Sequence, residues 1–65
     1  SRSNLSSERR LTGLAVGGET LEFTQPFKTR PLVICSGDLS VDTEDISSTE
    51  VRFSGANGGY IIIGE

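Results

Sequence analysis

The stretch LEFTQPFKTRPLVICS, at residues 21–36, decides the fold class that this sequence predicts. Its first residues alternate between apolar and polar side chains. Leu21 and Phe23 face one way and their polar neighbours face the other, which is the pattern of a half-buried β-strand. Pro26 cannot donate a hydrogen bond to a strand ladder, so the strand should end before it. We expect Phe27 to fold back as a plug at the end of the core.

Pro31 starts a second strand that continues through the apolar run at residues 32–35. Arg30 precedes this proline and is therefore biased toward extended backbone. A strand that is apolar at successive positions needs cover on both of its faces. One face would pack on the core of the domain, and the other on a second sheet or on a neighbouring subunit.

The rest of the chain carries the same signature of short strands separated by turns. Gly17 and Gly18 end a strand, and the glycine-rich run at residues 55–59 indicates a hairpin that joins the strands on either side of it. Residues 43–49 are polar apart from Ile46 and indicate a surface loop. These patterns predict an all-β domain. The expected architecture is a small antiparallel β-sandwich, or a small barrel, of about five or six short strands at residues 14–16, 20–24, 31–35, 39–41, 50–54 and 60–63.

The size of the chain limits how such a domain can be stable. Sixty-five residues form one small domain, whose single core gives marginal stability. Cys35 is the only cysteine and the chain has no histidine, so neither an internal disulfide nor a zinc site can add support. Oligomerisation is the support that remains, and an unusually well packed monomeric core is the alternative.

Charge is distributed unevenly along the chain. The net charge is −3, with five basic and three acidic side chains in residues 1–30 but one basic and six acidic side chains in residues 31–65. An acidic C-terminal half argues against nucleic acid as a partner, because phosphates require a basic surface. No apolar run approaches the roughly 20 residues of a membrane helix, so we expect no membrane insertion.

The N-terminal residues differ in character from the rest. Residues 1–10 are polar, with Leu5 as their one apolar residue. We interpret them as an arm or as the end of a fibre shaft, followed by the β-domain at residues 11–65. The chain opens at Ser1 and contains no methionine, so we interpret it as a fragment of a longer protein.

Catalytic chemistry and cofactors are not indicated. Without histidine, the usual nucleophile–base pairs cannot form. Cys35 lies within an apolar strand, where a thiol is an inert packing group. The acidic run at residues 42–45 lacks the spacing and the glycine of a calcium loop, and the glycines at 55–59 lack the lysine and the following helix of a phosphate loop. We therefore expect no enzyme activity, no metal site and no cofactor.

Carbohydrate binding is the remaining kind of ligand site that the sequence suggests. Sugar sites on β-sandwiches are shallow and combine hydrogen-bonding side chains with an aromatic face. The candidates for such a site, which lie near expected strand ends, are Asp38, Asp42, Arg52, Asn57 and Tyr60. For each of them the alternative is an ordinary polar residue of a loop or a strand edge.

Assembly follows most directly from the two apolar strands. The runs at residues 32–35 and 60–63 carry more apolar surface than one small sandwich covers, and exposed apolar surface of this kind marks an interface. The residues that we expect in contacts between subunits are Leu32, Ile34, Ile61 and Ile63. A monomer whose two sheets cover each other is the alternative.

The order of these features resembles the H-type lectin-like domain. The resemblance covers residues 20–63 and rests on a Phe-x-x-x-Pro step, here Phe27 to Pro31. This step follows an alternating strand that ends in phenylalanine and precedes two late strands separated by a glycine turn, the second of which opens on the aromatic Tyr60. Similar modules end bacteriophage tail fibres and spikes, where a polar stretch such as residues 1–10 joins a trimeric shaft.

The resemblance implies a six-stranded antiparallel sandwich that forms a homotrimer and binds sugars at loop ends between subunits. Arg52 matches a position where the family presents a polar contact. The predicted function is that of a non-catalytic trimeric β-domain of a phage or virion tail fibre or tail tip, which attaches to a host-surface glycan or receptor. Its expected location is the virion tail, or otherwise the extracellular space. The alternatives are a purely structural joining module of a fibre and a small lectin-like or protein-binding module of a cellular organism.

Overall fold

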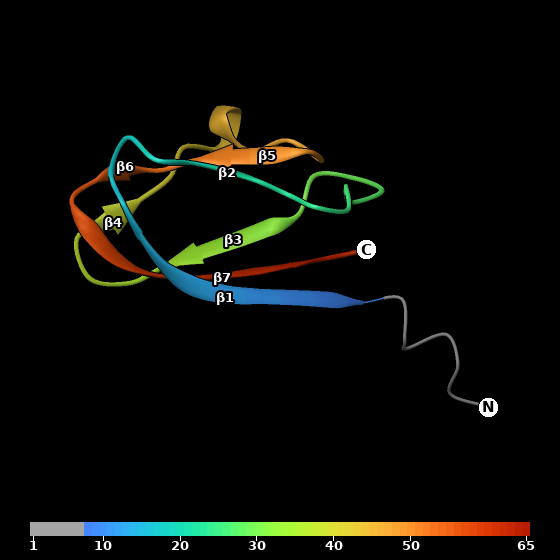
Figure 1. Cartoon of the computed structure of the whole chain (residues 1–65), viewed down its shortest axis with the longest axis horizontal. Helices are drawn as coiled ribbons and strands as arrows, with labels where there is room; N and C mark the ends of the chain where they lie inside the picture. The colour runs from blue at the N-terminus through green and yellow to red at the C-terminus, as the bar shows by residue number, and fades with distance from the viewer. Residues whose placement is uncertain (1–7) are drawn as a thin grey trace.

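The structure, a computed structural model, describes residues 8–65. Within these residues it is all-β, with seven strands in antiparallel sheets and a 3₁₀ helix of one turn (Figure 1). The predicted all-β class is therefore confirmed. The elements are β1 (Arg9–Val16), β2 (Thr20–Glu22), β3 (Leu32–Cys35), β4 (Leu39–Ser40), the 3₁₀ helix (Thr43–Asp45), β5 (Glu50–Arg52), β6 (Ser54–Gly55) and β7 (Asn57–Gly64).

The two longest strands and the apolar β3 form one antiparallel sheet in the order β1–β7–β3. β7 pairs with β1 along the full length of both strands, so the two ends of the described chain lie side by side (Figure 1). On its other edge β7 pairs with β3, where Ile62 lies opposite Val33. β7 is thus the central strand, and its β-branched isoleucines suit a position with a partner on each side.

Two smaller sheets, β2–β5 and β4–β6, lie across from the three-stranded sheet (Figure 1). Val51, Phe53 and Ile62 are the largest fully buried side chains. Burying a side chain of this kind contributes about 1.5–3 kcal/mol, so a core this small depends on each of them. The whole core consists of Ala15, Phe23, Phe27, Leu39, Ile46, Val51, Phe53 and Ile62.

Phe27 closes one end of this core. Its side chain is 4% exposed, and its ring meets the ring of Phe23 edge to face with centroids 4.9 Å apart. Such aromatic pairs add about 0.5–1.5 kcal/mol beyond the area that they bury. The prediction that Phe27 folds back as a plug is confirmed.

Arg9, at the start of β1, contacts the loop that contains Phe27. Its guanidinium donates hydrogen bonds to the carbonyl oxygens of Gln25, at 2.6 Å, and Pro26, at 3.0 Å, and its central carbon lies 4.1 Å from the centroid of the Phe27 ring. β1 accordingly begins at Arg9, before the strand expected at residues 14–16 and before the domain start expected at residue 11. The remainder of the predicted arm, residues 1–7, lies outside the described residues.

The hairpin predicted around residues 55–59 is wrong in its strand pairing. β5 pairs with β2, whereas β7 pairs with β1 and β3. Between them lies β6, which ends at Gly55, and a bend follows at Ala56. The φ of Gly55, +82°, is a conformation that glycine adopts without steric cost. Gly58 lies inside β7, where it approaches the Ser36 carbonyl so closely that a side chain would not fit. Gly55 therefore allows a change of chain direction, and Gly58 allows two strands to pack closely. The sequence pattern does not distinguish these roles from a hairpin turn.

Candidate functional site

The face of the three-stranded sheet that points away from the core is apolar. Side chains alternate along a strand, so the buried Ala15 and Ile62 mark the inner face and their neighbours in the strands point the other way. We call this the outer face and define it by Thr12, Leu14 and Val16 of β1, Leu32 and Ile34 of β3, and Ile61 and Ile63 of β7.

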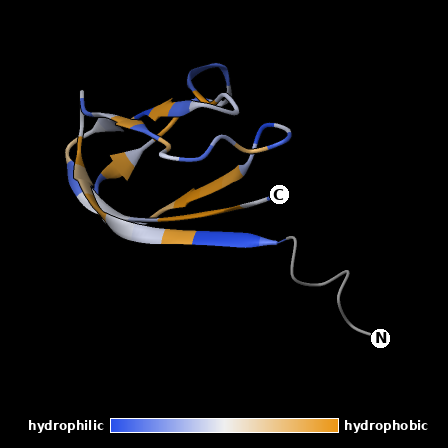
Figure 2. Cartoon of the chain, turned by 45° about the vertical axis from the view of Figure 1, so that its right-hand side comes forward, coloured by the Kyte–Doolittle hydropathy of each residue, from blue (hydrophilic) through white to orange (hydrophobic). Residues whose placement is uncertain are grey.

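The large hydrophobic side chains that are exposed within residues 8–65 all lie on the outer face. Their exposed fractions are 85% for Leu14, 60% for Leu32, 53% for Val16, 48% for Ile34 and 39% for Ile61. Single exposed apolar residues are ordinary on a soluble domain, but a contiguous group of them marks an interaction surface. In Figure 2 the hydrophobic stretches of β3 and β7 run beside each other.

The strand register places Leu32, Ile34 and Ile61 of this group in one contiguous area. Ile61 lies opposite Ile34 on one side and opposite Thr12 on the other, so a row of uncharged side chains crosses the whole sheet. Leu32 lies opposite Ile63 one step further along. Side chains that face each other in an antiparallel pair have Cβ atoms about 4.5–5.5 Å apart, which leaves little room for water between them. Arg10 borders this surface at the start of β1.

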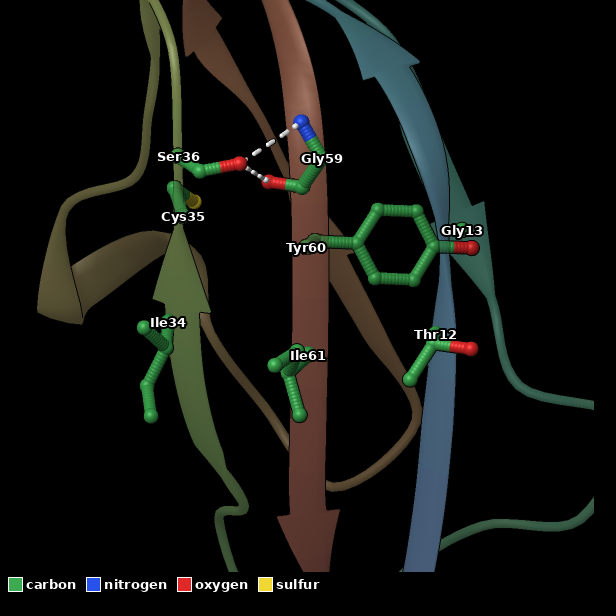
Figure 3. Close-up of a pocket in the computed structure, with 8 residues that line it drawn as sticks. All are labelled: Thr12, Gly13, Ile34, Cys35, Ser36, Gly59, Tyr60 and Ile61. Carbon is green, nitrogen blue, oxygen red and sulfur yellow. Dashed lines mark hydrogen bonds between the residues drawn. The ribbon is translucent and has the colours of Figure 1, made fainter.

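A shallow hollow lies in the outer face (Figure 3). Its volume is about 190 Å³, and Ile34, Ile61 and Thr12 form its walls. Gly59 leaves the space open, because it occupies a position where β7 would otherwise present an outward side chain. The Ser36 hydroxyl accepts a hydrogen bond from the Gly59 N–H at 3.2 Å, and the Ser36 N–H donates to the Gly59 carbonyl oxygen at 3.0 Å. The floor of the hollow is therefore fixed by the pairing of β3 with β7.

The residues predicted for subunit contacts share this face. Leu32, Ile34 and Ile61 are exposed on it, and Ile63 points the same way but is only partly exposed. That these residues contact another subunit stays a prediction.

Sequence reasoning missed the contribution of β1 to the outer face. Leu14 and Val16 are exposed there, and Ala15 between them is buried. The run of apolar residues at 14–16 hid this alternation in the sequence. The regular spacing of Thr12, Leu14 and Val16 is the signal that could have revealed it.

The residues predicted for a sugar site are spread over several parts of the fold. Asp38 and Asn57 lie together at one turn, where the Asp38 N–H donates to the Asn57 carbonyl oxygen at 3.1 Å. Asp42 precedes the 3₁₀ helix, and Arg52 is exposed on β5. Tyr60 points toward the inner face, where its ring stacks on the ring of Phe53. The structure thus brings Asp38 and Asn57 to one turn and places Tyr60 against the core.

Cys35 does not have the surroundings of a reactive thiol. It is half-buried on the inner side of β3, and this burial raises the pKa of its thiol above the ordinary value of 9.0. Because the thiolate is the nucleophile, a raised pKa makes the group less reactive near neutral pH. Within residues 8–65, no three histidine, cysteine, aspartate or glutamate side chains gather in a group that could hold a metal ion.

No family model, no curated protein and no solved structure matches this chain. Among residues 8–65, no helix is both long and apolar enough to cross a membrane. The functional interpretation therefore rests on the outer face and on its contrast with the rest of the surface.

Proposed function

We propose that this chain is a non-catalytic β-sandwich module that assembles with copies of itself through the outer face. The observation that carries the proposal is that the exposed large hydrophobic side chains of residues 8–65 all gather on this one face. Removing apolar surface from water contributes about 25 cal/mol per Å². A domain with so small a core gains a large share of its stability from such a contact.

The two sides of the domain support this choice of surface. We interpret β1–β7–β3 as one layer of the sandwich and the two small sheets as the other. On the second layer, the side chains that point away from the core are polar or charged and exposed, as expected for a face in contact with water. They include Thr20, Glu22, Glu50 and Arg52. The outward side chains of the β1–β7–β3 layer are instead mostly apolar.

The assembly that we propose is a homotrimer with the outer faces around its three-fold axis. The chain carries a net charge of −3, but the residues that define the outer face are uncharged. Arg10, which borders this face, is the one charged side chain of β1, β3 and β7 that points the same way, so copies approach through a surface that is otherwise uncharged. A cyclic trimer closes on itself, which limits assembly to a defined size.

We further propose that the trimer belongs to a phage or virion tail fibre and attaches to a host-surface glycan. The sequence resemblance to H-type lectin-like domains supports this part, through the step from the buried Phe27 to Pro31. Asp38 and Asn57, which share one turn, are the polar residues that we favour for the glycan contact.

Sedimentation equilibrium of the full chain at micromolar concentration tests the assembly. We expect a mass of three chains, and a mass of one chain for Ile34→Asp, which places a charge on the outer face. Thr20→Asp is the matched control, because it adds the same charge to an exposed strand position on the other layer. A monomeric wild-type chain would overturn the proposal. A dimer would overturn the trimer and leave self-association in place.

Glycan-array binding by the assembled chain tests the attachment. We expect binding that is lost in Asp38→Ala and in Asn57→Ala and kept in Glu44→Ala, which removes an exposed acidic side chain from the 3₁₀ helix. A folded trimer that binds no glycan would instead assign this chain a joining role within a fibre.

A further inference from the structure

We infer that Leu14 of one copy inserts into the hollow around Gly59 of a neighbouring copy. The inference rests on the proposed self-association and specifies the contact that holds it together. It comes from two features that lie next to each other on the outer face, a protruding leucine and an apolar hollow.

The protrusion is Leu14. Its exposed fraction of 85% is the highest of the large hydrophobic side chains on the outer face. It lies opposite Gly59 in the β1–β7 register, so it has no side chain facing it on β7. A Cβ atom placed on Gly59 would lie 3.7 Å from Leu14 Cδ2, so the leucine stands at the rim of the hollow of its own chain.

The hollow suits an aliphatic side chain. Its volume of about 190 Å³ exceeds the roughly 30 Å³ that one water occupies in the liquid, so it is large enough for several waters. Ile34 and Ile61 in its walls offer these waters no hydrogen-bond partners, and Thr12 and Ser36 are the lining residues that carry an aliphatic hydroxyl group. Displacing poorly bonded water by an apolar group favours association.

The placement of the two features suits a closed assembly of identical copies. Each copy carries both the protrusion and the hollow, so its Leu14 can enter one neighbour while its own hollow receives the Leu14 of another. Contacts of this head-to-tail kind form a ring when the rotation between copies closes. We therefore assign a second copy of this chain as the occupant of the hollow.

Two small substitutions test the contact by sedimentation equilibrium. Leu14→Ala removes the protrusion, and Gly59→Ala places a methyl group in the hollow. The added Cβ would lie 3.1 Å from Ser36 Oγ, which a small movement of that hydroxyl relieves. We expect each variant to raise the concentration for half-maximal association at least tenfold while the circular dichroism spectrum of the monomer stays unchanged. Thr20→Ala is the control, because it removes a side chain of similar size from an exposed position of β2 outside the outer face, and we expect a change of less than threefold.

The double variant and a direct distance measurement complete the test. If the two groups touch across the interface, the combined effect of Leu14→Ala and Gly59→Ala is smaller than the product of the single effects. In a mixture of isotope-labelled and unlabelled chains, we expect intermolecular NOEs from the Leu14 methyls to those of Ile34 and Ile61. Single variants that associate like the wild type, or the absence of these NOEs in the assembled chain, would overturn the inference. Loss of association in Ile34→Asp would in that case still support the proposed self-association.

Discussion

Phe53 stacks on Tyr60, with ring centroids 5.2 Å apart and ring planes inclined by 29°. Phe53 follows β5 and is 1% exposed, whereas Tyr60 lies in β7, so this contact joins the small sheets to the three-stranded sheet. On β1, Gly13 lies opposite Tyr60, and a Cβ atom there would lie 2.6 Å from Tyr60 Oη. The tyrosine ring thus occupies space that Gly13 leaves free, as aromatic residues do beside glycines in other sheets.

The first prediction concerns this aromatic pair. We expect Phe53→Ala to lower the free energy of unfolding by about 3–5 kcal/mol, because it leaves a cavity in a small core. Tyr60→Phe keeps the stacked ring and should change that free energy by less than about 1 kcal/mol. Urea denaturation in the Ile34→Asp background, which we expect to be monomeric, measures both values. Equal midpoints for the wild type and Phe53→Ala would show that the ring is not part of the core.

The second prediction uses two neighbours in β7. Ile62 is fully buried and Ile61 is 39% exposed on the outer face. Ile62→Asp buries an unpaired charge, and the total stability of a small domain is only about 5–15 kcal/mol, so we expect an unfolded chain. Ile61→Asp should leave a folded chain that does not associate. Circular dichroism and sedimentation equilibrium on both variants check the result, and the reverse outcome would mean that the register of β7 is wrong.

The third prediction concerns the loop that Arg9 holds. We expect Arg9→Lys to lower the free energy of unfolding by about 1–2 kcal/mol. A lysine keeps the charge but cannot reproduce the forked donation to Gln25 and Pro26 or the stacking on Phe27. Arg10→Lys is the matched control at the next, exposed position, with an expected change within about 0.5 kcal/mol. Equal effects of the two substitutions in urea denaturation would contradict the role of Arg9.

The fourth prediction concerns the pH dependence of Cys35. Burial raises the pKa of this thiol in the folded chain above its ordinary value of 9.0. The folded chain therefore keeps the proton where the unfolded chain loses it. As a result, the contribution of Cys35 to the free energy of unfolding is constant below about pH 9 and falls as the pH rises beyond that value. We expect the rate of alkylation by iodoacetamide to rise with an inflection above pH 9.0 in the folded chain and near pH 9.0 in urea. A folded-state inflection at or below the value in urea would contradict the burial of the thiol.

The sequence predicted much of the local structure correctly. The turn at Gly17–Gly18, the strand after Pro31 and the buried Phe27 are all present in the fold. These features depend on properties of single residues and their neighbours. Proline removes a donor, glycine permits unusual φ angles, and alternation places apolar side chains on one face.

The candidate site was predictable in part. The excess of apolar residues in two strands pointed to Leu32, Ile34 and Ile61, which are exposed on the outer face. The residues proposed for sugar binding do not all lie together in the fold. Their positions near strand ends in the sequence do not determine which strand ends are neighbours in space. Tyr60 lies against the core, while Asp38 and Asn57 share a turn.

By itself, the sequence determined that this chain is all-β, roughly where most of its strands lie, and that its apolar strands exceed what one small core covers. Only the tertiary structure decided that β7 pairs with both β1 and β3, that Phe53 and Tyr60 meet as stacked rings where a hairpin was expected, and that Leu14 and Val16 join the outer face. The physical reason is the range of the interactions. Strand boundaries follow from local backbone restrictions, whereas strand pairing is set by the burial of side chains far apart in the sequence, and a glycine-rich run allows a turn, a corner or close packing equally well.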